Sequence, residues 1–358
     1  MEYHILADTA YFIYGGEMKK ISTFCCALML MLAFILCTTA CNNKNDNLIR
    51  LNEVTHSIFY APLYVAIEKG FFSDVGLEIE LTNGGGADKS MSALLSGEAD
   101  IGLFGPEATI YVNKQTTNDA PKIFGQLTKR DGSFIVSKTQ INNFTWNDLR
   151  GKEIIGGRRG GVPAMVLEYG MKQGGLKPGN TLSSTVDTVL NLDVQFNLVA
   201  STFDSRTDDV FCTMFEPTAS EFNDSNRGYV VASVGALTGE IPYTAFSAKQ
   251  SFLRNNKDKA TKFLTAIVKS YNYIKTTNLD EVASCLVNQF PTTSKESIKK
   301  ALQSYLDIDA WCDTPVMKET SLDKLQSIIM DAGELDAKVA FDSVVDNTIA
   351  KEVIQALA

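Results

Sequence analysis

Hydrophobic and polar residues follow one another from Leu48 onward in a pattern that predicts strands and helices in turn. Apolar and acidic residues alternate over 76–81, which is typical of a strand with one face in water. Pro62 suits the first turn of a helix, where its missing N–H leaves no bond unmade, and Gly70 suits the end of that helix. Strand–helix–strand units of this size predict parallel sheets with right-handed crossovers.

The expected elements fall into two successive series. The first series has strands at 48–54, 76–81, 101–104 and 122–128, with helices that begin at Pro62, after an N-cap at Asp88, and at Pro106. The second series has strands at 153–155, 194–196, 210–215 and 228–234, with a helix at 163–173. Residues 243–248 are expected to return the chain to the first series, and the pattern from Ser251 onward is helical.

The N-terminal region has a different pattern, because an apolar run from Ser22 to Cys41 follows a pair of lysines. A basic start, an apolar middle and small residues before a cysteine predict an export signal over 1–41. The cysteine at the cleavage point favours a bacterial lipoprotein, with lipid on the Cys41 thiol and a polar linker at 42–48. An uncleaved membrane anchor is the alternative, since spanning helices need about 18 residues. Acidic residues ahead of the lysines suggest that Met18 is the true start.

The remaining chain is long enough for two lobes, because one hydrophobic core usually divides beyond about 250–300 residues. We expect an α/β protein of two hinged parallel-sheet lobes with a helical C-terminus. The expected boundaries are 49–135 for the first part of lobe I, 136–243 for lobe II and 244–358 for the second part of lobe I. Such a protein would lie on the outer face of the bacterial cell membrane, held there by its lipid.

Charge and cysteine content exclude several classes of function. The net charge is −9, and near −8 without residues 1–40, which carry two lysines and three acids. An acidic chain is a poor partner for nucleic acid. Cys212, Cys285 and Cys312 show no paired metal spacing, so we expect buried free thiols. His56 is the only histidine beyond the signal, which excludes a histidine-based zinc site; we interpret it as a solvated loop residue, with cleft lining as the alternative.

Ligands of parallel α/β sheets lie beyond the carboxyl ends of the strands. This rule selects the loops at 57–62, 83–86, 105–107, 156–161 and 215–217. The candidate ligand-binding residues in these loops are Phe59, Tyr60, Gly85, Gly105, Glu107, Arg158, Gly160, Gly161 and Glu216. No catalytic residues and no cofactor are expected.

Four motifs together carry a family resemblance. They are FYAPLYVAIEKGFF at 59–72, GGGAD at 84–88, LSGEADIG at 95–102 and FEP at 215–217. In combination they resemble the solute-binding proteins of ABC importers, in the group that binds nitrate, sulfonates, taurine or thiamine pyrimidine precursors. The resemblance implies a type II periplasmic-binding fold, a monomer that closes on a small ligand and delivers it to a membrane permease and its ATPase.

The candidate residues point to two different ligands. A helix start with two arginines at 156–161 suits a sulfonate or nitrate, the class that the resemblance favours. Glu107 and Glu216 would repel an anion but would accept hydrogen bonds from an aminopyrimidine, against walls formed by Phe59, Tyr60 and Phe104. Each residue also has a structural interpretation: helix capping or a hinge ion pair for the glutamates, and core packing for the aromatic rings.

Two rival functions remain open from the sequence. Enzymes with this fold make the thiamine pyrimidine, but the cysteine-rich motif that the resemblance would bring is not found beyond the signal. An exported sensor, whose closed form a signalling partner recognises, is the other rival.

Overall fold

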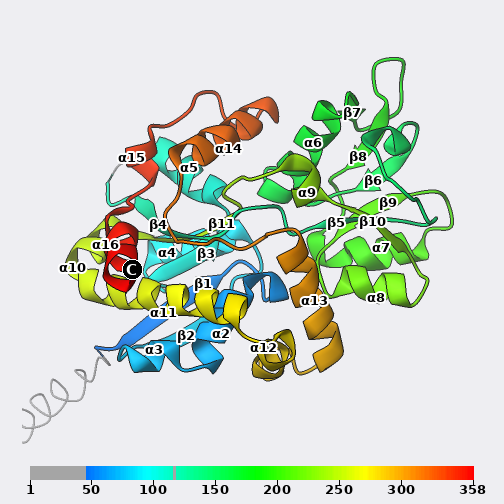
Figure 1. The fold of residues 1–358 in the computed structure, drawn as a ribbon. Coiled ribbons are helices and arrows are strands. Elements are labelled where there is room, and N and C mark those ends of the chain that lie inside the picture. Colours follow the sequence, from blue (N-terminus) through cyan, green and yellow to red (C-terminus); the bar gives the residue numbers. More distant parts are fainter. Residues whose placement is uncertain (1–45, 116–117) are drawn as a thin grey trace, which may run out of the picture. The chain divides into compact units, whose positions relative to one another are not determined.

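Two β-sheets form the centre of the structure, a computed structural model that describes residues 46–358 except 116–117 (Figure 1). The first sheet has the strand order β2–β1–β3–β11–β4. Its strands are β1 (Leu48–Glu53), β2 (Glu78–Asn83), β3 (Ile101–Phe104), β4 (Pro121–Thr128) and β11 (Thr244–Lys249). β1 runs parallel to β2 and β3, while β11 lies antiparallel between β3 and β4. The prediction that residues near 243–248 return the chain to the first sheet is therefore confirmed.

The second sheet has the strand order β10–β5–β9–β6–β8–β7. Its strands are β5 (Phe134–Ser137), β6 (Glu153–Ile155), β7 (Pro178–Gly179), β8 (Thr188–Asn191), β9 (Phe211–Met214) and β10 (Tyr229–Ser233). β6 is parallel to both β8 and β9. The strand expected at 194–196 is wrong, because β8 lies a few residues earlier and a short 3₁₀ helix, η3 (Phe196–Leu198), follows it.

Helices surround both sheets (Figure 1). With the first sheet are η1 (Ile58–Tyr60), α2 (Ala61–Glu68), α3 (Phe71–Asp74), α4 (Ala87–Ser96) and α5 (Pro106–Gln115). With the second are η2 (Trp146–Leu149), α6 (Val162–Gln173), α7 (Val199–Ser205), α8 (Thr218–Asp224) and α9 (Val234–Thr238). The C-terminal series is α10 (Gln250–Asn255), α11 (Lys257–Thr276), α12 (Leu279–Leu286), α13 (Lys295–Asp307), α14 (Glu319–Asp331), α15 (Phe341–Val344) and α16 (Thr348–Leu357).

Proline and glycine set the helix ends as their backbone preferences require. Pro62 lies in the first turn of α2, and Gly97 ends α4 in the left-handed conformation with φ of 84°. The N-cap expected at Asp88 is wrong, because Gly86 occupies that position. Asp88 instead lies in the first turn, where its negative charge suits the positive end of the helix.

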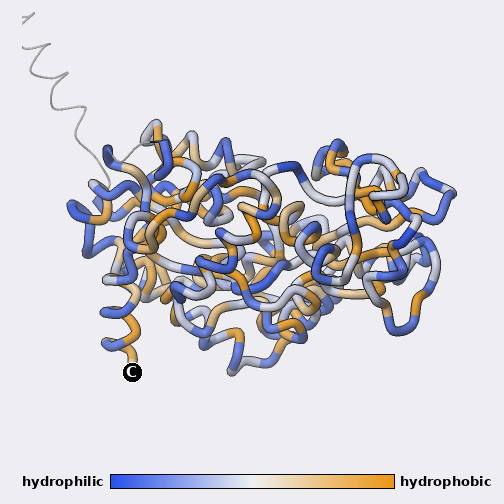
Figure 2. The backbone as a smooth tube through the Cα atoms, turned by 90° about the horizontal axis from the view of Figure 1, so that it is seen from above, coloured by the Kyte–Doolittle hydropathy of each residue, from blue (hydrophilic) through white to orange (hydrophobic). Residues whose placement is uncertain are grey.

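The chain passes between the sheets twice, from Thr128 at the end of β4 to Phe134 in β5 and from Ser233 in β10 to Thr244 in β11. Two C-terminal helices also reach the second sheet's helices, since α13 packs on α8 and α14 packs on α6. The described part from Asn47 onward forms one compact unit with a shared hydrophobic core. Figure 2 shows hydrophilic stretches mostly on its outer loops.

The three cysteines of this unit are free thiols. Cys212 and Cys312 are buried as expected, but Cys285 is only partly buried, because it lies on α12 near Lys69 at the edge of the packing with α2. Within the described part of the chain, no helix combines the length and the apolar character needed to cross a membrane. The predicted signal and Cys41 lie outside the described residues.

Candidate functional site

The site begins at Glu107, which opens α5 directly after β3. Its side chain is 4% exposed, and its Oε2 atom has no hydrogen-bond partner. A Cβ atom on Gly105 would lie 2.0 Å from this oxygen, so the carboxyl group can fold back over the backbone only because residue 105 is glycine. Glu107 is therefore held in a buried place with one oxygen free.

The carboxyl group of Glu107 is within electrostatic reach of Val162, the first residue of α6, whose helix packs with the other sheet. Burial raises the pKa of Glu107 to about 7, although the charge of Arg158 and the backbone amide of Val162 lower it. The start of α6 is the anion-binding position that the sequence suggested. In this structure the protein's own carboxyl group lies within its electrostatic reach.

A second buried acid lies on the first segment that crosses between the sheets. Asp131 is fully buried, and its Oδ1 atom accepts hydrogen bonds from the backbone N–H of Ser133 at 2.7 Å and the Ser133 hydroxyl at 2.5 Å. Its Oδ2 atom has no hydrogen-bond partner. Burial raises the pKa of Asp131 to about 7, against the lowering effect of Ser133 and Tyr243.

Tyr243 lies on the second crossing segment, just before β11, and its buried hydroxyl approaches the Asp131 carboxyl group in a contact looser than an ordinary hydrogen bond. Burial raises the pKa of Tyr243 well above its usual value, and the charges of Asp131 and Glu107 and the neighbouring Tyr60 hydroxyl raise it further. The pKa of Tyr60 is also raised, mainly by burial and further by the charges of Glu53 and Glu107. The rings of Tyr60 and Tyr243 each lie 5.6 Å from the Phe59 ring, Glu107 acts on both tyrosines and Asp131 acts on Tyr243. We call these four buried residues the polar cluster (Glu107, Asp131, Tyr60 and Tyr243).

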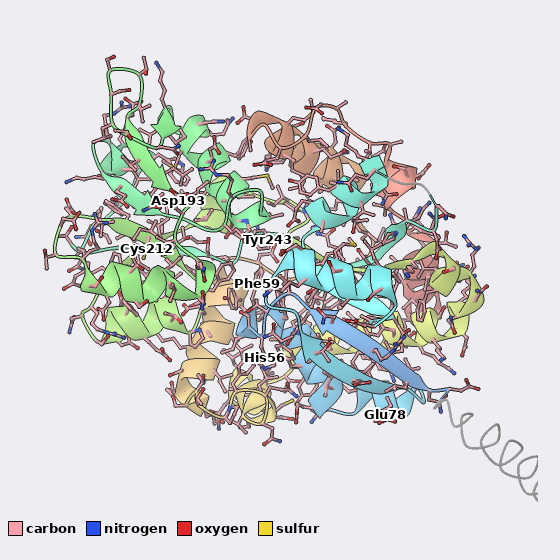
Figure 3. The ribbon with its side chains drawn as sticks, turned by 180° about the vertical axis from the view of Figure 1, so that it is seen from behind. His56, Phe59, Glu78, Asp193, Cys212 and Tyr243 are labelled. Atoms are coloured by element: carbon pink, nitrogen blue, oxygen red, sulfur yellow. The ribbon has the colours of Figure 1, made fainter. Side chains whose placement is uncertain are left out.

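Phe59 lies beneath the polar cluster as part of the core. Its ring is fully buried, and its centroid lies between 5.0 and 5.8 Å from the rings of Tyr60, Phe215, Tyr243 and Tyr305. The Phe59 carbonyl accepts a hydrogen bond of 2.8 Å from the Trp311 indole. Figure 3 shows Phe59 and Tyr243 where the segments of the two sheets meet. Phe104, the third expected wall, is also fully buried and packs with Met91 and Leu94.

The loop before α6 meets the first sheet's helices through two contacts and is closed by a hydrogen bond of its own. Arg158, whose side chain is 55% exposed, forms an ion pair of 3.2 Å with Asp88 of α4. The Tyr111 hydroxyl of α5 donates to the Gly160 carbonyl at 3.3 Å, while the Gly161 N–H donates to the Arg158 carbonyl at 3.1 Å. Contacts of this kind hold the two sheets' loops together in the present conformation.

Two further candidates have local partners. The Glu216 carboxyl group is buried but accepts hydrogen bonds from the N–H and hydroxyl of Ser220, at 3.0 and 2.8 Å, and so caps the start of α8. Its own N–H donates to the Tyr305 hydroxyl at 3.1 Å. Gly85 is exposed, and its N–H donates to Asn83 at 2.9 Å.

The interpretation of His56 as a solvated residue is wrong. Its ring lies between Tyr64 and Phe290, with Nδ1 2.7 Å from Glu53 and Nε2 2.9 Å from the Gln289 carbonyl. Burial lowers the pKa of His56, but the hydrogen bond and charge of Glu53, with the Gln289 carbonyl, raise it overall. His56 therefore joins the loop after β1 to the end of α12.

Sequence comparison decides the family. The model of the NMT1/THI5-like family matches residues 58–277 of this chain. A relative from Bacillus subtilis (strain 168), named "Putative binding protein YtlA", is 37% identical over 331 residues, which cover 92% of this chain and 96% of the relative. The chain belongs to the NMT1/THI5-like family.

Solved structures of periplasmic binding proteins and of one enzyme share the fold of this family member. The nitrate-binding protein NrtA from Synechocystis PCC 6803 is 17% identical, with a TM-score of 0.65 over 87% of this chain and 89% of NrtA. The aliphatic sulphonate-binding protein SsuA from Escherichia coli is 13% identical, with a TM-score of 0.65 over 85% of this chain and 99% of SsuA. The desulfurization enzyme DSZB, 12% identical, has a TM-score of 0.60 over 87% of this chain and all of DSZB. The expected type II periplasmic-binding fold is confirmed.

The sequence pattern did not identify two members of the polar cluster in this NMT1/THI5-like chain. Asp131 and Tyr243 lie on the crossing segments rather than in strand-to-helix loops. The rule that ligands lie beyond the carboxyl ends of parallel strands therefore does not select them. Their signal is weak: an acid two residues before a serine, and a tyrosine before a strand. No group of three or more acidic, histidine or cysteine side chains placed to hold a metal ion is found among residues 46–115 and 118–358.

Proposed function

We propose that this NMT1/THI5-like chain is the lipid-anchored solute-binding protein of an ABC importer on the outer face of a bacterial cell membrane. The observation that carries the proposal is the polar cluster. Buried polar atoms normally have hydrogen-bond partners, yet one carboxyl oxygen of Glu107 has none, and the remaining polar atoms of Asp131 and Tyr243 have only a loose contact with each other. Such atoms are what a bound solute would satisfy.

The mechanism is closure of the two lobes around the solute. Glu107 and Asp88 come from the first sheet's helices, whereas Val162 and Arg158 come from the second, so a solute between them touches both lobes. A ligand that binds the closed form more tightly shifts the equilibrium towards it. The permease and its ATPase then receive the solute from the closed form, and the protein acts as a monomer.

The proposal considers two classes of ligand. The structural neighbours NrtA and SsuA are named for nitrate and sulphonate binding, and the start of α6 with Arg158, Gly160 and Gly161 supports a small anion of the nitrate, sulfonate or taurine type. The alternative is a thiamine pyrimidine precursor, for which Glu107 would accept a hydrogen bond from an exocyclic amine. Phe59 and Tyr60 would support either ligand from below.

Lipid anchoring completes the proposal. The thiol of Cys41 is the attachment point after removal of residues 1–40, and residues 42–48 link it to the folded unit. The NMT1/THI5-like relative YtlA carries a binding name, which supports a role without catalysis, whereas the fold shared with DSZB keeps an enzyme or a sensor as rival functions to be tested.

The test is a thermal-shift panel on residues 42–358, which contain the compact unit. Taurine, alkanesulfonates, nitrate, aminopyrimidines and thiamine are added in turn, because a ligand that binds only the folded state raises the melting temperature. The proposal predicts that at least one small solute raises the melting temperature and is recovered unchanged. Conversion of the solute into a product, or a flat panel, would contradict it.

A further inference from the structure

Helix α14 contacts helices that belong to different sheets (Figure 1). On one side it packs on α6, which contacts β7 of the second sheet, and on the other it contacts α15, which packs on β4 and α5 of the first. Before α14, the Met317 N–H donates to the Asn347 side chain at 3.0 Å, and the Met317 carbonyl accepts from it at 2.8 Å. Beyond α15, Val345 forms a bridge with Ile123 of β4. The chain is therefore fixed beside the first sheet on both sides of α14.

The loop after α14 folds back onto the helix. The Gln326 side chain accepts a hydrogen bond from the Val339 N–H at 2.7 Å and donates one to the Val339 carbonyl at 3.2 Å. Leu335 of this loop is buried. Residues 318–339 thus form one small unit, which we call the clasp. Its ends have little slack, because it begins directly after Met317 and ends two residues before the start of α15.

Lys172 of α6 holds the last turn of the clasp helix. Its Nζ atom donates to the Asp331 carboxylate at 2.9 Å and to the Asp331 carbonyl at 3.0 Å. Asp331 is the final residue of α14, where carbonyl groups lack helical partners and a positive charge is favoured. An ion pair of 2.9 Å with Glu168 of its own helix keeps the Lys172 ammonium group on this face of α6.

Lys324 joins the middle of α14 to the second crossing segment. Its Nζ atom donates to the Thr238 carbonyl at 2.8 Å and to the Glu240 carbonyl at 3.2 Å. Thr238 is the last residue of α9, so the lysine satisfies a carbonyl that the helix leaves open. Burial and then the charge of Arg130 lower the pKa of Lys324, while Glu240 raises it. A half-buried ammonium group depends on such carbonyl partners.

The clasp also borders the loop before α6. A Cβ atom on Gly160 would lie 3.6 Å from the Glu334 carboxyl group, and the Gly160 carbonyl accepts the hydrogen bond from Tyr111 of α5. Asp336 of the clasp forms an ion pair of 3.5 Å with Lys114, which is also on α5. The clasp therefore lies beside the place where the loops of the two sheets meet.

These contacts oppose separation of the two sheets. If α6 moved away with the second sheet, the clasp would have to follow it or release it. Following α6 would bend both short ends of the clasp at once, against the bonds of Met317 and the bridge at Val345. Release breaks only the contacts of the clasp with α6 and with the end of α9, and closure forms them again.

We propose that the clasp is a latch, whose contacts with Lys172 and with the end of α9 raise the fraction of closed molecules before any solute arrives and break when the lobes separate. The inference goes beyond the proposed function, because it concerns the solute-free protein and takes from that function the motion of the lobes alone. A solute then meets a larger share of the binding-competent form, so its apparent affinity rises by the same factor as that share.

The experiment counts open and closed molecules in the absence of solute. Energy transfer is measured in single molecules of residues 42–358, with labels at Glu98→Cys and Ser183→Cys, both exposed and one beside each sheet. A Cys285→Ser background removes the partly buried native thiol.

The clasp variants are Lys172→Met and Lys324→Met, which keep an unbranched apolar side chain and lose the ammonium group. Lys172→Arg is the conservative variant, since it can still pair with Asp331. The matched control is Lys257→Met, which removes an exposed ion pair of 2.7 Å between α11 and α16, both beside the first sheet.

The latch predicts that the ratio of closed to open molecules falls about threefold in Lys172→Met, as for a partly exposed ion pair. The ratio falls about tenfold in Lys324→Met, because a charged donor to two carbonyl groups is lost. Lys172→Arg and Lys257→Met keep the wild-type ratio. Added solute then shortens the mean distance more in the clasp variants than in the wild type.

A ratio that neither clasp variant changes, or that Lys257→Met lowers as much, overturns the inference. If Lys324→Met fails to fold, Lys172→Met decides alone, because its lysine is partly exposed. The count needs no solute, so a flat thermal-shift panel would overturn the proposed function and leave the latch standing.

Discussion

Replacing Glu107 by glutamine tests whether burial governs the charge state of the polar cluster. Burial raises the pKa of Glu107 from an ordinary value near 4.5 to about 7. A raised pKa means that the folded state holds the proton more firmly than the unfolded state does. The contribution of Glu107 to stability is therefore fully present below about pH 4.5 and is lost as the pH rises through about 7.

The size of the effect follows from the pKa. The rise of the pKa from 4.5 to about 7 corresponds to roughly 3 kcal/mol of free energy of unfolding, which the ligand-free wild-type protein loses by pH 8. The amide that Glu107→Gln introduces lacks a full set of partners, at a cost of about 1 kcal/mol. The variant should thus be about 2 kcal/mol more stable than the wild type at pH 8, and close to it at pH 5. For roughly 310 residues this is a gain of about 3 °C in melting temperature.

The assay is thermal and denaturant unfolding of the ligand-free protein at pH 5 and pH 8. Glu216→Gln is the matched control, because its carboxyl group is equally buried but accepts two hydrogen bonds from Ser220. The free energy of unfolding of Glu216→Gln should be lower than that of the wild type by about 1–2 kcal/mol at both pH values. The reasoning is refuted if Glu107→Gln is less stable than the wild type at pH 8, since the start of α6 would then stabilise the carboxylate by more than burial destabilises it.

Three further predictions concern other parts of the chain. His56→Gln should lower the free energy of unfolding by about 1 kcal/mol at pH 5.5 and by less at pH 9. Because the pKa of His56 is raised in the folded state, its stabilising contribution is present below about pH 6.5 and is lost as the pH rises through the folded-state pKa. Urea titrations at both pH values measure this difference. Gly105→Ala should displace the Glu107 carboxyl group, which a Cβ atom would approach to 2.0 Å, and so weaken ligand binding at least tenfold by calorimetry without unfolding the protein. Cys41→Ser should release the protein from the membrane fraction of the cell, as detected by immunoblot; retention in the membrane would contradict lipid anchoring at Cys41.

The sequence predicts the fold well where single residues have strong backbone preferences. Pro62 and Gly97 fix ends of α2 and α4, and the alternation near β2 identifies that strand. The prediction fails at β8, because the run from Thr188 to Phe196 is apolar at alternate positions over most of its length and allows more than one strand placement. Parallel pairing with β6, which joins Glu153 to Val189, selects the earlier placement, and this pairing is not visible in the local pattern.

The candidate site could be predicted only in part for a related reason. Glu107 lies at a strand end and is found by the general rule for parallel sheets. Asp131 and Tyr243 look like ordinary connecting residues in the sequence, and their importance arises from burial where two distant segments meet. Conversely, the charge of Glu216 suggested a ligand contact, but its carboxyl group accepts two hydrogen bonds from Ser220 of α8.

The most direct test of the account is the distance between the two lobes with and without solute. Fluorescent labels at Glu98→Cys and Ser183→Cys, both exposed and one beside each sheet, are placed in a Cys285→Ser background of residues 42–358, in which the other two native thiols are buried. A control pair at Glu98→Cys and Asn255→Cys lies within the first lobe. The account predicts that a solute which raises the melting temperature shortens the first distance and leaves the control distance unchanged. Binding without any change in the distance between the lobes would contradict it.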